Sequence, residues 1–417
     1  MTPKKTKVLL VLSRAVIPAD GGRETLILDF IRRISPHCEI HIAFFDNKRK
    51  PLNEVMPEYE KAGISSIIPL KRPSAFNIFR NLLSVKPTLQ EALFYSHENS
   101  KSILHIISSK KIDVVYFDMI RLFRYALETR KYSTARIIYD LDDLLSLRYS
   151  YFMESDSKSL NLLGSYSNFI GNEKIKSIIN TLGRLLLSIE SRRSLKREIE
   201  ASRVSNVILL TSPAEQHIYQ ERIKNSIATF TNFPVIEKPR NTRPLDHSNS
   251  KELIWLGNNE VPHNLAALEN LIKSIKPKLK QHRLQIAGKT SGKTLTEFSG
   301  IAGIEFIGYV DDIDSFLLPG KILIAPFKFG TGIKIKLLEA IAHRVAVITN
   351  DIGFQGIPFK ENTCFRPLNS DDDMIAAAQR LSSDEGFLTK WLDEQSFILD
   401  RYFSNSYELE ILKSALD

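Results

Sequence analysis

The sequence predicts an α/β protein with two doubly wound, Rossmann-like domains, and two observations support this prediction. Short runs rich in Val and Ile alternate with helical patterns along the chain. These runs show little apolar–polar alternation, which is typical of strands buried on both faces of a parallel sheet. The alternation gives way to a polar stretch with two prolines at residues 236–250, and then restarts. A repeated βα order on both sides of one linker indicates two doubly wound sheets.

Residues 1–235 form the predicted N-terminal domain. Its expected strands are residues 7–12, 39–45, 112–117, 135–140 and 206–211. Helices are expected over residues 24–34 and 122–132. Residues 150–200 interrupt the alternation as a helical insertion, which ends in a basic cluster: Arg192, Arg193, Lys196 and Arg197. This segment is either a core-packed helix with a solvated basic end or a contact for an anionic membrane or lipid carrier.

Residues 251–395 form the predicted C-terminal domain, after the linker at residues 236–250. Its expected strands are residues 252–257, 283–288, 304–310, 321–327 and 345–350. Helices are expected over residues 263–282 and 332–343. The tail at residues 396–417 is expected to be a helix that crosses back to the N-terminal domain.

Composition excludes several classes of protein. Hydrophobic residues make up 43% of the 417 positions and charged residues 25%, which excludes a disordered chain, a collagen and a coiled-coil rod. Two cysteines cannot form a disulfide framework, so a reducing, cytoplasmic compartment is expected. No apolar run approaches the roughly 18–20 residues that span a bilayer. The opening lysines and VLLVL indicate a first buried strand and not a signal peptide.

The net charge of +9 is unevenly distributed. Residues 1–235 hold 35 Lys and Arg against 24 Asp and Glu, a balance of +11, and residues 236–417 hold 22 against 24, a balance of −2. A basic surface can meet nucleic acid, anionic lipid or a phosphorylated substrate. The sequence shows no zinc spacing, no aromatic RNA signature and no helix-turn-helix pattern, so nucleic acid is not expected as a partner.

The most informative stretch is residues 325–357, where a strand is followed by a Gly-rich loop and a helix. Glycines permit positive φ and let backbone N–H groups approach an anion, and the helix N-terminus adds its positive dipole end. Lys334 and Lys336 lie in the first helical turn, and Glu339 shares the face of Lys336. A carboxylate there could bind the paired hydroxyls of a ribose. The pattern therefore predicts a nucleotide diphosphate site, the alternative being a glycine turn before an ordinary amphipathic helix.

The run GTGIKIKLLEA…VAVITNDIGFQGI resembles the donor-site segment of glycosyltransferase family 4, whose members have the GT-B fold. Four further segments resemble that family in the right order: residues 18–31, 206–219, 253–279 and 304–317. The resemblance implies two domains facing across a cleft and a metal-independent reaction that retains the anomeric configuration. The nucleotide-diphosphate sugar is then a co-substrate, and no cofactor or metal is expected. The implied donor-binding residues are Gly21, Gly22, Asn258, Val310, Gly330, Thr331, Gly332, Lys334, Lys336, Leu338 and Glu339.

Two departures from the family pattern concern the donor site. The family usually has two glutamates eight positions apart, but Thr331 stands eight positions before Glu339. Because the first glutamate usually orients the transferred sugar, the identity of that sugar is open. The usual Arg and Lys after the first donor-domain strand are also missing. Lys334 or Lys336 could replace their charge, and we expect Lys336, because a Lys-x-x-Glu arrangement accompanies the Gly-x-Gly subtype of the family. We assign Lys336 and Glu339 to catalysis.

The second candidate segment is residues 136–152, in which a buried strand is followed by a group of carboxylates. Asp140, Asp142 and Asp143 lie at the carboxyl end of this strand, where doubly wound sheets bind ligands. Resemblance to the family's strand–His-Asp pattern makes Asp142 a catalytic candidate that polarises the acceptor hydroxyl or contacts the donor sugar. The alternatives are N-capping of the next helix and a metal-binding Asp-x-Asp as in GT-A enzymes. The expected acceptor-side residues are Arg23, Asp143, Arg148 and Tyr149.

The sequence therefore predicts a retaining glycosyltransferase that moves a sugar from a nucleotide-diphosphate sugar to a glycan or glycolipid hydroxyl. The expected process is synthesis of a cell-envelope polysaccharide or lipopolysaccharide. The expected location is the cytoplasm, with peripheral attachment to an anionic inner membrane face. The alternatives are a nucleotide-sugar 2-epimerase of the GT-B fold and an inactive glycan- or nucleotide-binding relative.

Overall fold

The computed structural model divides the chain into two compact units, and each is described by itself. Unit 1 comprises Met1–Phe233 and Ser406–Asp417, and unit 2 comprises Pro234–Asn405. The structure describes residues 5–19, 22–45, 51–83, 87–154, 183–223, 227–231, 236, 239, 243–330, 332–359, 363–403 and 408–416. Gly21, Thr331 and residues 155–182 of the expected insertion lie outside these ranges.

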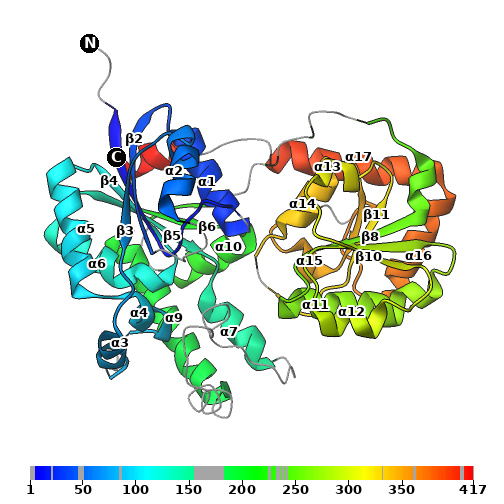
Figure 1. Cartoon of the computed structure of the whole chain (residues 1–417), viewed down its shortest axis with the longest axis horizontal. Coiled ribbons are helices and arrows are strands. Elements are labelled where there is room, and N and C mark those ends of the chain that lie inside the picture. The colour runs from blue at the N-terminus through cyan, green and yellow to red at the C-terminus, as the bar shows by residue number, and fades with distance from the viewer. Residues whose placement is uncertain are drawn as a thin grey trace. The chain divides into compact units, whose positions relative to one another are not determined.

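Unit 1 is built on a seven-stranded parallel sheet with strand order β3-β2-β1-β4-β5-β6-β7 (Figure 1). The strands are β1 (Thr6–Leu12), β2 (Cys38–Phe45), β3 (Ile64–Leu70), β4 (Val114–Asp118), β5 (Arg136–Asp142), β6 (Val207–Leu210) and β7 (Ala228–Thr231). The central strands are buried because their side chains pack on both faces. The strand order reverses between β1 and β4, which is where a doubly wound sheet opens a crevice at its carboxyl edge.

Two apolar layers cover this sheet. Helices α1, α2 and α18 pack on one face, and α5, α6, α9 and α10 pack on the other. The helices of unit 1 are α1 (Gly22–Ile34), α2 (Leu52–Lys61), α3 (Ala75–Leu82), α4 (Leu89–Phe94), α5 (His97–Lys110), α6 (Phe123–Tyr132), α7 (Leu145–Glu154), α9 (Gly183–Val204), α10 (Pro213–Arg222) and α18 (Glu408–Leu416), with the 3-10 turn η1 (Ile120–Leu122). The last helix, α18, thus completes the unit in which the chain begins.

Unit 2 is built on a five-stranded parallel sheet with strand order β10-β9-β8-β11-β12, which reverses between β8 and β11 (Figure 1). The strands are β8 (Glu252–Leu256), β9 (Arg283–Ala287), β10 (Ile304–Gly308), β11 (Ile322–Ala325) and β12 (Ala346–Thr349). The helices are α11 (Pro262–Asn270), α12 (Gly292–Phe298), α13 (Ile313–Phe316), α14 (Ile335–Ala342), α15 (Asp351–Phe354), α16 (Asp371–Ser383) and α17 (Glu385–Tyr402). Short turns are η3 (His247–Lys251), η4 (Leu271–Ile275, a π-helical turn) and η5 (Lys276–Lys278).

The expected α/β class and both doubly wound sheets are confirmed, and all ten expected strands are present. The sequence did not predict β3 and β7, the two edge strands of the first sheet. Both are partly exposed and contain Ser or Thr, and β3 contains Pro69, which edge strands tolerate. The helix expected over residues 263–282 is instead divided, and it gives way to a 3-10 turn at Pro277 because proline cannot continue an α-helix. Within the described residues, no helix is long and apolar enough to cross a membrane.

Candidate functional site

The Gly-rich loop of unit 2 joins β11 to α14 at the point where the strand order of the second sheet reverses. Gly330 has φ of +139° and Gly332 has φ of +74°, both of which strongly favour glycine. Helix α14 follows at Ile335 with no side-chain cap and no acidic residue in its first turn. The loop and helix therefore present an uncapped, positive helix end at the carboxyl edge of the sheet.

Lys336 extends from the first turn of α14 toward the end of β8. Its Nζ donates to Asn264 Oδ1 at 2.8 Å, and it lies 4.4 Å from the ring centroid of Trp255 and 5.0 Å from that of Phe327. No carboxylate pairs with Lys336 among the residues that the structure describes. Its contacts within the described part of the chain are an amide oxygen and two aromatic faces, which attract a cation but carry no net charge.

The environment of Lys336 is held in place by neighbouring residues. The Trp255 indole donates to Asn259 Oδ1 at 2.7 Å, and Asn264 Nδ2 donates to the Asn258 carbonyl at 3.0 Å. A Cβ at Gly257 would lie 2.8 Å from Lys336 Nζ, so a side chain at this position would displace the ammonium from Asn264. Asn264 was not predicted from the sequence, because its role depends on which helix packs beside α14.

Burial, together with the neighbouring charge of Lys334, lowers the pKa of Lys336 to about 7. The protein therefore holds this amine in a place where its charged form is disfavoured until an anion arrives. Such a perturbed group in a ligand-binding edge is typical of a functional site.

The other expected donor residues of α14 differ in their surroundings. Lys334 is buried and its Nζ donates to the Gly332 carbonyl at 2.7 Å, so it closes the loop. The side chain of Leu338 is fully buried and packs in the core. Burial raises the pKa of Glu339, and the charge of His343 opposes this. The carboxylate of Glu339 has no hydrogen-bond partner among the described residues.

The remaining donor residues lie at strand ends. Asn258 follows β8 and accepts from the Glu260 backbone N–H at 3.0 Å through Oδ1, and Val310 follows β10 and is partly buried. Gly22 is the first residue of α1 in unit 1. Gly21 and Thr331 lie outside the described residues.

In unit 1, Arg23 binds three aspartates at the carboxyl edge of the first sheet. Its Nε and Nη2 donate to Asp118 Oδ1 at 3.0 and 2.8 Å, its Nη2 lies 3.0 Å from Asp140 Oδ2, and its Nη1 donates to Asp142 Oδ1 at 3.3 Å. Ser13, just after β1, donates to Asp118 Oδ2 through both its backbone N–H and its hydroxyl. The guanidinium is thus engaged by this chain's own carboxylates.

The charges of this aspartate group influence one another. Although burial opposes both charged forms, the carboxylates raise the pKa of Arg23, and Arg23 holds the pKa of Asp118 below its ordinary value. Burial, with Asp143 and Asp140, raises the pKa of Asp142 to about 6, against the opposing charge of Arg23. Asp142 is the partly exposed member of the group and has φ of +65°, an uncommon conformation for a residue other than glycine.

The expected acceptor-side residues next to Asp142 have structural partners. Arg148 pairs with Asp143, and Tyr149 is buried beside Leu187 of α9. The N–H of Ser146 at the start of α7 donates to Glu198 at 2.8 Å, so a carboxylate from α9 accepts there. Asp143 and Arg148 thus neutralise each other within unit 1.

Two buried glutamates near this edge were not predicted from the sequence. Burial raises the pKa of Glu198 to about 7 and, together with Asp143, that of Glu215 to about 8. Glu215 lies on α10 and its carboxylate accepts from the Leu144 backbone N–H. Both come from helices far along the chain, so the packing of α9 on β5 and of α10 on β6 brings them here.

The aspartates do not resemble a metal site. Their oxygens converge on the Arg23 guanidinium, which occupies the position that a divalent cation would need. Across the residues that the structure describes, no group of three or more His, Cys, Asp or Glu side chains is arranged to hold a metal ion.

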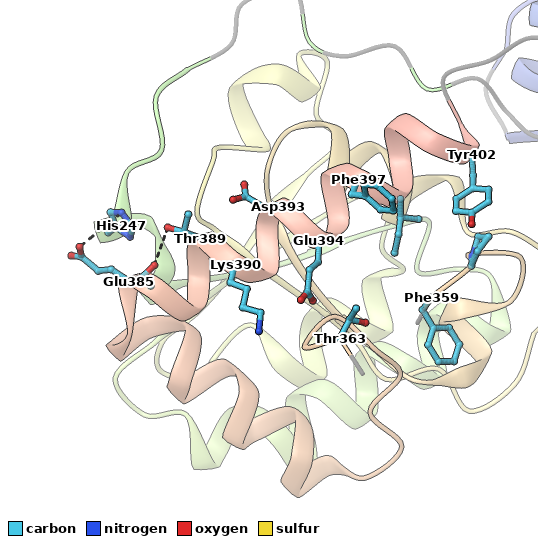
Figure 2. Close-up of a pocket in the computed structure, with 13 residues that line it drawn as sticks. His247, Phe359, Thr363, Glu385, Thr389, Lys390, Asp393, Glu394, Phe397 and Tyr402 are labelled. Atoms are coloured by element: carbon cyan, nitrogen blue, oxygen red, sulfur yellow. Dashed lines mark hydrogen bonds and ion pairs between the residues drawn. The ribbon is translucent and has the colours of Figure 1, made fainter. Parts of the chain in front are cut away.

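A cavity of about 890 Å³ lies elsewhere in unit 2, along α17 (Figure 2). Phe359, Phe397 and Tyr402 line its apolar part. The carboxylate of Glu394 in its wall accepts from the Phe365 backbone N–H at 2.9 Å and from Cys364. None of the expected site residues lines this cavity. The candidate functional residues therefore remain those at the carboxyl edge of the sheet in each unit.

Residues 250–384 match the family model of the glycosyl transferases group 1. The chain carries a group 1 glycosyltransferase domain. This match covers β8 to α16 and includes the Gly-rich loop, Lys336 and Glu339. No curated protein sequence matches the glycosyltransferase.

Solved structures resemble the glycosyltransferase over nearly its whole length. Anabaena HepE with UDP and glucose has a TM-score of 0.58 at 12% identity, covering 97% of both chains. A mutant of S. aureus TarM with fondaparinux, α-GlcNAc-glycerol and UDP has a TM-score of 0.64 at 10% identity, covering 99% of this chain and 100% of the other. The lipopolysaccharide outer core galactosyltransferase WaaB has a TM-score of 0.59 at 13% identity, covering 99% of both chains. At these identities the likeness establishes the fold, and the expected GT-B fold is confirmed. The family 4 assignment and the Gly-x-Gly…Lys-x-x-Glu subtype stay predictions.

We predict that Arg23→Met destabilises the glycosyltransferase by about 3–5 kcal/mol, because it leaves two fully buried aspartates without their cation. Chemical denaturation measures the free energy of unfolding. The matched control is Arg32→Met on the same helix, an exposed residue whose pair with Asp29 is worth little, so a change within about 0.5 kcal/mol is expected. Equal stability of the two variants would show that the aspartate group does not depend on Arg23.

Proposed function

We propose that this protein is a retaining glycosyltransferase that moves a sugar from a nucleotide-diphosphate sugar to a hydroxyl of a glycan or glycolipid. The observation that carries the proposal is Lys336, an amine without a carboxylate partner among the described residues, beside a Gly-rich loop and an uncapped helix end. An anion bound there would form an ion pair with the ammonium of Lys336 and would also interact favourably with the positive end of the α14 dipole. A diphosphate is the anion that we propose for this site, because solved structures of the similar protein HepE contain UDP or UDP-glucose.

In the proposed reaction, the group that leaves the sugar is the nucleoside diphosphate. Negative charge grows on its terminal phosphate as the glycosidic bond breaks. The ammonium of Lys336 and the N–H groups at the start of α14 would stabilise that charge, and they are already oriented before the reaction. Glu339 would accept hydrogen bonds from sugar hydroxyls, because a carboxylate is an acceptor only.

On the acceptor side, we propose that Asp142 polarises the hydroxyl that attacks the sugar. Its pKa of about 6 makes it a better proton acceptor than an ordinary aspartate while it is still ionised near neutral pH. Arg23 would hold Asp142 in place and keep its pKa from rising further. Asp143, Arg148 and Tyr149 would support the shape of this region through their own contacts.

Our choice of nucleotide and acceptor rests on the ligands of the similar solved structures. HepE is described with UDP and glucose, and TarM with UDP and glycan ligands. We therefore propose UDP as the first nucleotide to test and an envelope glycan as the acceptor class, in cytoplasmic synthesis of a polysaccharide or lipopolysaccharide. No metal or cofactor is included in this proposal.

A thermal-shift screen with UDP, GDP and ADP tests the proposal first, followed by a donor assay with and without an acceptor glycan. Sugar transfer only when acceptor is present supports the transferase. Conversion of the sugar nucleotide without any acceptor would instead indicate the 2-epimerase, and binding of none of the three nucleotides would indicate an inactive glycan-binding relative.

Part of the basic cluster in α9 is available for an anionic membrane. Arg193 pairs with Glu190 and Arg197 with the buried Glu91, so these two arginines contribute to the fold. Arg192 and Lys196 are exposed, one helical turn apart, and have no ion pair among the described residues. We propose that these two attract the protein to the inner membrane face, where a lipid-linked acceptor would lie.

We predict that Glu339→Ala lowers donor turnover by about 10²-fold or more. Two hydrogen bonds to a charged group, worth roughly 1.5–3 kcal/mol each, would be lost from the transition state. Initial rates with the sugar nucleotide that the wild type consumes measure the effect. The control, Glu385→Ala, changes an exposed glutamate of α17 and should keep the full rate. Wild-type turnover in the Glu339 variant would contradict its role.

We predict that Lys336→Ala weakens binding of UDP by about 10- to 100-fold and leaves binding of uridine nearly unchanged, because the ammonium should contact phosphate. At pH 8 the free amine is mostly neutral, since its pKa lies near 7, and binding of the diphosphate should return it to the charged form. Wild-type calorimetry at pH 8 should thus show uptake of up to one proton that the variant lacks, and the difference should shrink at pH 6. Equal losses for UDP and uridine would overturn the assignment.

A further inference from the structure

Helix α3 of unit 1 presents its apolar side chains outward. Phe76 is 72% exposed, Phe79 61% and Leu83, just after the helix, 68%. These positions are three and seven residues apart and so share one face of the helix. A helix on the surface of a water-soluble domain ordinarily shows the opposite arrangement.

The polar side of α3 is the side that anchors it. Asn81 is buried, and its Nδ2 donates to the carbonyls of Ala92 and Tyr95, at 3.1 and 2.9 Å, at the end of α4. Ser74 caps the other end by accepting from the Asn77 N–H at 3.3 Å. Figure 1 shows α3 at the margin of unit 1, beside α4. The outward position of the phenylalanines therefore follows from how the helix is attached.

Basic residues predominate around this face, and one of them, Lys71 just before α3, pairs with the exposed Glu98 of α5. Residues 71–83 contain three basic residues and no acidic residue, and Arg80 is exposed on α3 without an ion pair among the described residues. On α9, Leu185, Ile189, Arg192 and Lys196 are exposed at spacings of three and four. Helix α9 also contacts α4, because Glu190 accepts from the Leu89 N–H at 2.7 Å. The exposed faces of α3 and α9, two helices that contact α4, thus combine large apolar side chains with cations that have no ion pair among the described residues.

We propose that the outward face of α3, formed by Phe76, Phe79 and Leu83, inserts into the headgroup region of an anionic lipid bilayer. Apolar side chains beside cations are the pattern by which interfacial helices bind anionic membranes. The absence of acidic residues from α3 favours an anionic lipid surface over a second copy of this basic unit. This proposal depends on surface chemistry and goes beyond the proposed sugar transfer.

Co-sedimentation with vesicles tests the proposal on the full-length protein. Vesicles of 30% phosphatidylglycerol in phosphatidylcholine are compared with pure phosphatidylcholine at about 0.1 M salt. The wild type should bind the anionic vesicles, and Phe76→Ser with Leu83→Ser should lower the partition coefficient by about tenfold or more. The matched control is Leu127→Ser with Tyr132→Ser on α6, which removes one leucine and one aromatic residue from another exposed site and should bind like the wild type.

The outcomes separate the possible partners. Arg192→Ser with Lys196→Ser should weaken binding mainly at low salt, because screening reduces the electrostatic part as the Debye length falls to about 3 Å at 1 M. No binding of the wild type to anionic vesicles would overturn the proposal and leave a protein partner for this face. Equal binding by the α3 variant and the wild type would also overturn it.

A tryptophan reporter distinguishes insertion from simple attraction. The protein has two tryptophans, Trp255 and Trp391, both fully buried, so Phe79→Trp adds an exposed reporter. Its emission should shift to shorter wavelength with anionic vesicles and stay constant with pure phosphatidylcholine, and an unchanged emission would overturn insertion. Nucleotide binding is measured on the same variants. Variants that lose lipid binding but still bind nucleotide have lost only the function of this face. A protein that binds lipid but no nucleotide would contradict the proposed function and leave the membrane proposal intact.

Discussion

In both units, every strand is parallel to its neighbours, and the candidate chemistry depends on this constraint. Parallel strands end at the same edge of a sheet, so the loops that follow them meet there. Where the strand order reverses, consecutive loops diverge and leave room for side chains. Ser13, Asp118 and Asp142 gather at such a point in unit 1, and Gly257, Phe327 and Lys336 gather at one in unit 2.

The two edges share an architecture but carry opposite charge. Unit 2 holds an amine without a carboxylate partner among the described residues, and burial lowers its pKa. Unit 1 holds a group of aspartates around one arginine, and burial raises the pKa of the most exposed aspartate. In each case the surroundings disfavour the charged form in the free protein. Asp142 therefore binds a proton more strongly than an ordinary aspartate does, and an anion bound beside Lys336 would favour the charged form of the amine.

The outer surface of unit 1 includes one helix face that is apolar and exposed to water. Most of its helices bury apolar stripes against the sheet, but α3 is attached through Asn81 and leaves its phenylalanines in contact with water. Exposure of these apolar side chains to water costs free energy, which a partner that covers them would recover. Exposed apolar faces on otherwise well-packed domains are commonly binding surfaces. The local basic charge determines which partner is favoured.

The sequence by itself determined the architecture. Strands of a buried parallel sheet are continuous runs rich in Val and Ile, and such runs can be recognised without knowledge of the tertiary structure. It also located the Gly-rich loop, where positive φ favours glycine at residues 330 and 332. The partly exposed edge strands β3 and β7 are interrupted by Ser, Thr or Pro, so their sequences predict a strand only weakly, and the structure was needed to find them.

Only the tertiary structure decided what each charged residue contacts. Arg23, expected to face a substrate, is instead enclosed by carboxylates from strands that lie about 95–119 positions later in the sequence. Lys336 is oriented by Asn264, which lies 72 positions earlier on a neighbouring helix. Spacing along the chain reports on local backbone geometry, whereas charge pairing and burial depend on which distant elements pack together. For that reason the sequence located the candidate site, and the fold determined its electrostatics.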